Sequence, residues 1–183
     1  IYNLAARYQD KTFLVDESYI DFSEYPSIIR LLEKNPLENV IVIKSLSKSL
    51  GMPGIRLGYV YSYNESMNEF VKANLPIWNL NSLAEYVLEI MLKHRTSIEQ
   101  SYADTIKDRE AFAAALLQGD LVEKVFPSAA NFILVSLKQA DLDDRDPTDG
   151  LLSKHGIFIY NASNKFGAER KYYRFAVRLP REN

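Results

Sequence analysis

A lysine flanked by hydroxyl side chains is the stretch of this sequence best suited to chemistry. Ser45, Ser47 and Lys48 follow an apolar run at residues 40–43, and Arg56 stands eight residues after the lysine. Hydroxyl donors beside a guanidinium suit a phosphate group, because the guanidinium can bind two oxygens at once. The amine of Lys48 could then act as a nucleophile. The alternative is a solvated turn, and the residue order excludes a nucleotide P-loop, in which the lysine follows the glycines.

A second polar cluster precedes this loop in the chain. A short β-branched and aromatic run at residues 12–15 leads directly into Asp16, Glu17 and Tyr19. The three carboxylates Asp16, Glu17 and Asp21 could form a metal site, a helix cap or a proton-handling group. No histidine lies nearby, which favours a cap or loop over a transition-metal site, and we expect no metal here.

Two predicted strands position these clusters at one edge of a sheet. The runs at 12–15 and 40–43 have the composition of strands, and one helical stretch at residues 27–34 separates them. A strand–helix–strand unit of this kind makes the strands parallel, so both carboxyl ends meet at the edge where open α/β sheets bind ligands. After a loop rich in glycine and proline, residues 55–61 are predicted to form a further strand.

The loop sequence Ser-Leu-Ser-Lys, followed by Gly-Met-Pro-Gly-Ile-Arg-Leu-Gly-Tyr, closely resembles the Schiff-base lysine segment of fold-type I pyridoxal-phosphate (PLP) enzymes. Among them it is most similar to the class I/II aminotransferases, on the branch of histidinol-phosphate aminotransferase and threonine-phosphate decarboxylase. The resemblance implies that Lys48 forms the Schiff base and that Ser45, Ser47 and Arg56 hold the cofactor phosphate. It also implies that Lys48, once displaced by substrate, moves the Cα proton as general acid and base.

Asp16 and Tyr19 match another motif of these enzymes, an aspartate followed three residues later by a tyrosine. The resemblance implies that Asp16 faces the pyridine nitrogen and keeps it protonated, so that the ring accepts electrons from a substrate carbanion. It places the Tyr19 phenol at the ring oxygen, where it tunes the Schiff base.

The sequence from residue 96 onward predicts a second unit, because a long helix is followed there by several short strands. A long helix is expected over residues 96–118, closed by Gly119, and a surface loop over residues 141–149 with a helix beginning near Pro147. Short strands are predicted at residues 122–126, 131–137, 157–160 and 172–177. The last of these resembles the C-terminal strand of the family's small domain, which implies that Arg174 binds the substrate α-carboxylate.

Tyr160 departs from the family pattern. Where the phosphate-using relatives have Gly-Ile-x-Ile-Arg-Asp, this chain has Gly-Ile-Phe-Ile-Tyr-Asn at residues 156–161. The resemblance makes Tyr160 a substrate-binding residue together with Arg174. Tyr160 can donate one hydrogen bond but supplies no positive charge, which disfavours a phosphorylated substrate.

The helical stretch that begins near residue 82 carries apolar side chains at helical spacing. We expect an Asn or Ser to cap its start and His94 to lie at its end. Its apolar face is predicted to be core and consists of Leu83, Tyr86, Val87, Ile90 and Met91.

Composition limits the classes of function. The 183 residues are 47% hydrophobic and carry a net charge of −2, which gives no sign of nucleic-acid or membrane-surface binding. There is no cysteine, which excludes a disulfide framework and a thiol nucleophile and fits a cytoplasmic protein. The apolar stretches are too short to span a bilayer. Because the chain lacks an initiator methionine and the first half of the family's large domain, we expect it to be a fragment.

These features predict an α/β fold with two parts. Residues 1–95 are expected to be the second half of a PLP-transferase large domain, mainly a parallel sheet with helices, and residues 96–183 a small α+β domain without its last helix. The expected parent is a homodimeric PLP-dependent aminotransferase whose small-molecule substrate is an amino acid. Two alternatives remain: an amino-acid decarboxylase of the threonine-phosphate decarboxylase type, and a non-catalytic fragment that does not hold PLP. The fragment alone is expected to be inactive.

Overall fold

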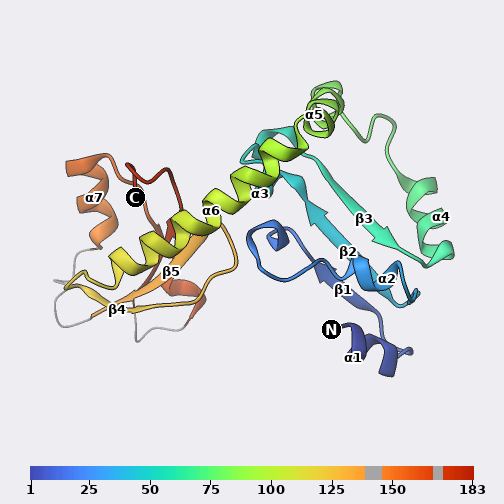
Figure 1. The fold of residues 1–183 in the computed structure, drawn as a ribbon, viewed down its shortest axis with the longest axis horizontal. Coiled ribbons are helices and arrows are strands. Elements are labelled where there is room, and N and C mark those ends of the chain that lie inside the picture. Colours follow the sequence, from blue (N-terminus) through green and yellow to red (C-terminus); the bar gives the residue numbers. More distant parts are fainter. Residues whose placement is uncertain (139–145, 167–170) are drawn as a thin grey trace. The chain divides into compact units, whose positions relative to one another are not determined.

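The computed structural model describes residues 1–138, 146–166 and 171–183. It divides into two compact units, Ile1–Tyr102 and Ala103–Asn183, which are described separately (Figure 1). The division falls inside the long helix α6 (Arg95–Leu116). The domain boundary predicted between residues 95 and 96 stays a prediction.

The first unit contains a three-stranded sheet that orders the candidate site. Its strands are β1 (Phe13–Asp16), β2 (Val40–Ser45) and β3 (Gly58–Ser62), in the order β1-β2-β3. Strands β1 and β2 are parallel, with Asp16 opposite Ile43, which confirms the predicted strand–helix–strand unit. Strand β3 runs antiparallel to β2 and brings Gly58 opposite Ser45. The polar ends of β1 and β2 and the start of β3 therefore meet at one edge.

One face of this sheet is packed against α1 (Tyr2–Arg7) and α2 (Ile29–Leu32). The buried residues of this core are Ala5, Ile28, Leu32, Val40 and Val42. The helix predicted over residues 27–34 is present in shorter form as α2, and Glu17 holds the two residues that precede it. The buried Glu17 carboxylate accepts hydrogen bonds from the Ile28 N–H at 2.7 Å and the Ser27 hydroxyl at 2.6 Å. Glu17 thus holds the segment that leads into α2, although the helix itself has no side-chain cap.

The strand predicted over residues 55–61 begins later than expected. Pro53–Ile55 form a 3₁₀ turn, and Arg56 has a left-handed backbone with φ of 58°. A residue with positive φ cannot continue a strand, so pairing with β2 starts only at Gly58. The apolar Ile55 and Leu57 instead enter a small core beneath the loop.

The helices α3 (Leu46–Ser49), α4 (Glu65–Asn74) and α5 (Ser82–Lys93) complete the first unit. The expected cap of α5 is confirmed, because the Asn81 side chain accepts a hydrogen bond from the Ala84 N–H at 2.9 Å. His94 caps the other end of α5, also as expected.

The predicted core face of α5 is wrong in part. Leu83, Tyr86 and Ile90 are 60%, 61% and 38% exposed. The helix packs on Ile55 and Leu57 through a neighbouring stripe that consists of Ala84, Val87 and Leu88. Both stripes have helical spacing, and α5 is apolar on more than one side, so spacing alone could not select the buried one.

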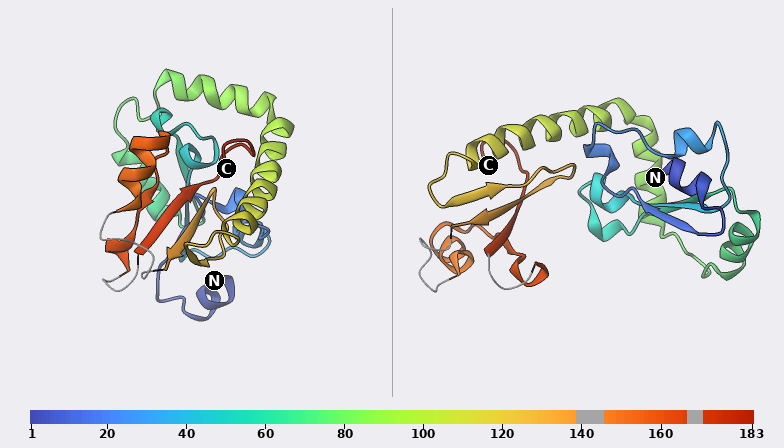
Figure 2. Two further views of the ribbon diagram at one scale, coloured as in Figure 1. Left: turned by 90° about the vertical axis from the view of Figure 1, so that its left-hand side faces the viewer. Right: turned by 90° about the horizontal axis from the view of Figure 1, so that it is seen from below.

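The second unit is an antiparallel sheet packed against helices α6 and α7 (Pro147–His155), seen from two further sides in Figure 2. Its strands, in spatial order, are β4 (Val122–Val125), β5 (Phe132–Leu137), β7 (Lys171–Ala176) and β6 (Tyr160–Asn161). The buried residues of this core are Ile133, Val135, Leu137, Ile159 and Tyr173. The long helix, three of the four strands and the helix beginning at Pro147 agree with the sequence prediction; residues 141–145 of the predicted loop lie outside the described residues.

The strand predicted over residues 157–160 is wrong for most of its length. The Ile157 N–H donates to the Leu151 carbonyl at 3.2 Å, and Gly156 adopts a left-handed backbone with φ of 66°. These features close the end of α7, so the chain at Ile157 still belongs to the helix cap. Pairing with β7 begins only at Tyr160, which faces Arg174 across the two strands.

Candidate active site

A cavity of about 630 Å³ lies where β1 and β2 end and β3 begins. Four of the six residues predicted to hold the cofactor contribute to its walls, namely Asp16, Ser45, Ser47 and Arg56. The other two, Lys48 and Tyr19, are not among its lining residues. They lie beside each other, with the Lys48 ammonium 5.9 Å from the centre of the Tyr19 ring. Lys48 follows the cavity residue Ser47 directly on α3.

Ser18 connects the two polar clusters at this edge. Its N–H and its hydroxyl both donate to Oδ1 of Asp16, at 2.9 and 2.5 Å. The Ser18 hydroxyl in turn accepts a hydrogen bond from the Ser45 N–H at 3.0 Å. Ser18 therefore ties the end of β1 to the end of β2. Sequence reasoning missed this residue, although a serine two positions after an aspartate is a known turn signal.

The side chain of Ser47 is buried, at 5% exposed, and in the described part of the chain its hydroxyl has no hydrogen-bond partner. A buried hydroxyl without a partner is costly unless a ligand supplies one. Because the Ser47 residue also lines the cavity, this orphaned donor fits a ligand with acceptor oxygens. A phosphate group meets that requirement.

Arg56 brings a cation to the same cavity. Its left-handed backbone is unfavourable for a side chain with a Cβ, and such strain is concentrated at functional sites in proteins. One guanidinium nitrogen, Nη1, donates to the Pro53 carbonyl at 3.1 Å. The remaining donors of the guanidinium are available for an anion.

Gly58 allows β3 to approach the loop closely. A Cβ built on Gly58 would lie 2.7 Å from the Lys44 carbonyl oxygen and 3.4 Å from the Ser45 Cα. The first distance is too short for any side chain, and the clashing atom is backbone. The absence of a Cβ at Gly58 thus sets the geometry of this wall of the cavity.

Two lysines stand four residues apart here, and their environments differ. The Lys44 ammonium forms an ion pair with Asp21 at 2.6 Å, and the two side chains are only 12% and 18% exposed. The Lys48 side chain is exposed and faces the Tyr19 ring. Burial, followed by the negative charges of Glu17 and Asp21, raises the pKa of Tyr59, which pairs with Lys44 across the sheet. The ammonium of Lys44 is therefore occupied by its ion pair with Asp21.

The second unit places the two predicted substrate residues side by side. Tyr160 on β6 is opposite Arg174 on β7. The guanidinium carbon of Arg174 lies 5.0 Å from the centre of the Tyr160 ring and 5.0 Å from the centre of the Phe132 ring. Arg174 is thus in cation–π contact with two aromatic rings and exposed to solvent.

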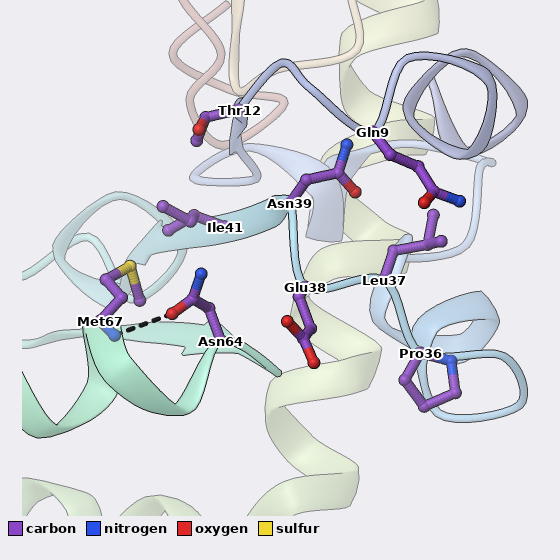
Figure 3. Close-up of a pocket in the computed structure, with 9 residues that line it drawn as sticks. All are labelled: Gln9, Thr12, Pro36, Leu37, Glu38, Asn39, Ile41, Asn64 and Met67. Atoms are coloured by element: carbon purple, nitrogen blue, oxygen red, sulfur yellow. Dashed lines mark hydrogen bonds between the residues drawn. The ribbon is translucent and has the colours of Figure 1, made fainter.

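A second cavity, of about 640 Å³, lies at the opposite end of β2 (Figure 3). The side-chain amides of two of its residues are already used. Asn39 donates to the Ala5, Tyr8 and Lys11 carbonyls, and the Asn64 oxygen accepts from the Met67 N–H. None of the nine lining residues is a lysine, arginine or histidine. This cavity lacks the cation that a phosphate requires, so it is a weaker candidate.

In residues 1–138, 146–166 and 171–183 there is no group of three or more His, Cys, Asp or Glu side chains that could hold a metal ion. Over the same residues, none of the helices combines the length and apolar character needed to cross a membrane.

Comparison with known proteins gives consistent matches along the chain. Residues 1–183 match the family model described as "Aminotransferase class I and II". A histidinol-phosphate aminotransferase of Flavobacterium johnsoniae is 35% identical over 93% of this chain and 46% of its own length. An L-serine phosphate decarboxylase of Campylobacter jejuni is 34% identical over 94% of this chain and 45% of its own length.

The structural comparison leads to the same family. The crystal structure of L-threonine-O-3-phosphate decarboxylase from Porphyromonas gingivalis has a TM-score of 0.83 and 27% sequence identity, covering 99% of this chain and 54% of that one. The chain therefore has a PLP-transferase fold and spans about half the length of these relatives. The chain belongs to the family of class I and II aminotransferases, whose members depend on PLP.

Proposed function

We propose that the full-length protein containing this chain is a PLP-dependent aminotransferase that acts on an amino acid and bonds its cofactor through Lys48. The observation that carries the proposal is the buried Ser47 hydroxyl, which lacks a partner in the described part of the chain and lines the same cavity as Arg56. A phosphate group satisfies this donor, and the adjacent residue in the chain is the exposed Lys48.

The residues present fit the cofactor. Ser45, Ser47 and Arg56 would hold its phosphate, which combines hydroxyl donors with a guanidinium. Asp16 uses Oδ1 for Ser18, and in the described residues its Oδ2 has no hydrogen bond, so a carboxylate oxygen is available for the pyridine nitrogen. Tyr19 would serve the ring oxygen. When bound, PLP supplies the electron sink for a carbanion at the substrate Cα.

The chain's own residues then carry binding and proton transfer. The Lys48 amine, on the short helix α3, removes the proton from the substrate Cα as general base and, once protonated, acts as general acid. Arg174 binds the substrate carboxylate through its fork of N–H donors, and the flanking Phe132 and Tyr160 rings limit its rotation. Tyr160 adds no positive charge, and we therefore propose a substrate without a phosphate group.

Decarboxylation is the second candidate, favoured by the 34% identity to an L-serine phosphate decarboxylase. Both reactions need the same cofactor-binding residues and differ in which bond to Cα is broken. Product analysis separates them: transamination gives an oxo acid from the amino acid, and decarboxylation gives carbon dioxide and an amine.

We further propose that the full-length protein is a homodimer and that the 183-residue chain alone is inactive. The chain covers only 46% of the histidinol-phosphate aminotransferase from F. johnsoniae, so a comparable enzyme needs about as much chain again. The exposed apolar side chains of α5, Leu83, Tyr86 and Ile90, are surface that such additional chain or a second subunit would cover.

Borohydride reduction of the full-length protein with PLP tests the assignment. Peptide mapping should find the pyridoxyl label on Lys48, and Lys48→Ala should lose the label and the visible absorbance band while still binding PLP through Ser45, Ser47 and Arg56. Lys44→Arg is the matched control: the arginine keeps a positive charge for Asp21 but cannot form a Schiff base, so the label should remain on Lys48. A label on Lys44 in the unmodified protein would show that the assignment is wrong.

A further inference from the structure

Asp146 holds three elements of the second unit together. Its Oδ1 accepts hydrogen bonds from the Thr148 N–H at 3.0 Å and from the Tyr173 hydroxyl at 3.2 Å. Its Oδ2 accepts a hydrogen bond from the Asn161 side-chain amide at 2.6 Å. Thr148 lies in the first turn of α7, Asn161 belongs to β6 and Tyr173 belongs to β7. One carboxylate therefore joins a helix start to two neighbouring strands.

These contacts lie one residue away from the pair that carries the proposed substrate site. Asn161 is opposite Tyr173 in the β6–β7 ladder, and the next pair is Tyr160 with Arg174. Strand β6 has only two residues, so few backbone hydrogen bonds fix it to β7. The side chain of Tyr173 is fully buried, which makes its hydroxyl a rigid point of attachment.

We propose that Asp146 is a positioning residue for carboxylate recognition: by holding β6 against β7, it keeps the Tyr160 ring in contact with the Arg174 guanidinium. This inference rests on the proposed role of Arg174 in substrate binding. An arginine that is held before the ligand arrives loses less conformational entropy on binding than a mobile one. Asp146 itself does not touch the substrate and acts through Tyr160 and Arg174.

The competing explanation is that Asp146 only caps α7, and substitution to serine separates the two roles. In Asp146→Ser the short hydroxyl still accepts from the Thr148 N–H, because serine is a good N-cap residue, but it no longer reaches Asn161 and Tyr173. Asp149→Ser is the matched control: it makes the same substitution on the first turn of α7, at an exposed position.

The experiment measures inhibition of the PLP-loaded, full-length enzyme by propionate, a simple carboxylate that competes with the substrate. Asp146→Ser should raise the propionate inhibition constant and KM about 2- to 10-fold, the range expected for releasing one ordered side chain. Propionate should bind the Asp149→Ser control as it binds the unmodified enzyme. PLP affinity should be the same in all these variants.

A double substitution shows whether Asp146 acts through Arg174. Arg174→Gln alone should weaken propionate binding, and adding Asp146→Ser to it should produce no further loss. Losses that add would mean that Asp146 acts independently and would overturn the inference. If Asp146→Ser does not fold, Tyr173→Phe removes one contact of the same carboxylate and should raise the inhibition constant in the same direction.

The outcomes also separate this inference from the proposed function. If Arg174→Gln leaves propionate binding unchanged, the proposed role of Arg174 fails and the inference fails with it. If Arg174→Gln weakens binding while Asp146→Ser and Tyr173→Phe bind propionate normally, only the inference about Asp146 is overturned.

Discussion

Substitution of Gly58 by alanine should damage the candidate cofactor cavity through a clash with the backbone alone. The added Cβ would lie 2.7 Å from the Lys44 carbonyl oxygen, whereas ordinary van der Waals contact begins at 3.4 Å. Relief requires β3 to move away from β2 by about 0.7 Å at the register pair Ser45–Gly58. Overpacking of this kind typically costs about 1–3 kcal/mol. That cost corresponds to a factor of roughly 5 to 150 in the unfolding equilibrium.

Gly54→Ala provides the matched control. A Cβ at Gly54 meets no atom within 4 Å, and its backbone has no positive φ. Replacing such a glycine usually changes stability little or raises it by about 0.4–1 kcal/mol, because the unfolded chain loses freedom. The two variants therefore make the same chemical change four residues apart with opposite expected signs.

The assay is denaturant unfolding followed by circular dichroism, together with titration of PLP by its visible absorbance. In the full-length protein, Gly58→Ala should unfold at lower denaturant concentration and bind PLP at least about fivefold more weakly, which is the effect of about 1 kcal/mol. Gly54→Ala should match or exceed the unmodified protein in both. The reasoning is refuted if the two variants are indistinguishable, because the close approach of β3 to the Lys44 carbonyl would then not constrain the cavity.

Three further predictions follow from individual side chains. Asp16→Asn in the full-length protein should keep the turn with Ser18 yet lower kcat by orders of magnitude, which a kinetic assay with PLP in excess measures; near-normal turnover would leave Asp16 as a loop cap. Tyr160→Arg should raise kcat/KM for phosphorylated substrates more than for their uncharged analogues, and a strong phosphate preference in the unmodified enzyme would contradict this. Burial raises the pKa of Asp146, but hydrogen bonds, the first from Thr148, outweigh it and lower the pKa below its ordinary value of 3.8. The ionised carboxylate therefore stabilises the folded protein above pH 3.8, and this contribution is lost as the pH falls through the folded pKa. Acid unfolding below about pH 4 should therefore depend less on pH in Asp146→Asn.

The sequence could predict that β1 and β2 are parallel and at which edge of the sheet their polar ends meet. Both features depend only on the order of neighbouring elements along the chain. One helical stretch between two short apolar runs is enough to make β1 and β2 parallel and to bring Asp16 and Ser45 to the same edge. The caps at Asn81 and the start of α7 at Pro147 were predictable for a similar reason, since each depends on residues within one turn.

The features that sequence reasoning missed depend on partners far away in the chain. Ser18 matters because it meets Ser45, and Asp146 matters because it meets Tyr173, 27 residues later. The buried stripe of α5 depends on where Ile55 and Leu57 lie, which its own spacing does not contain. A left-handed backbone at Arg56 has no signal in the residue type, because arginine rarely adopts that conformation.

Lys44 and Lys48 are only four residues apart, yet their side chains have different surroundings and can do different chemistry. Lys44 is still on β2, pairs with Tyr59 in the sheet, and has its ammonium held by the largely buried Asp21. Breaking that pair would leave a carboxylate with little solvent, so Lys44 cannot leave Asp21 without a cost in stability. Between the two lysines the chain changes from strand to helix, which removes Lys48 from the sheet and leaves its amine exposed beside Tyr19. A nucleophilic amine must be free to leave one bond and form another, which favours Lys48 over Lys44 for the proposed bond to the cofactor.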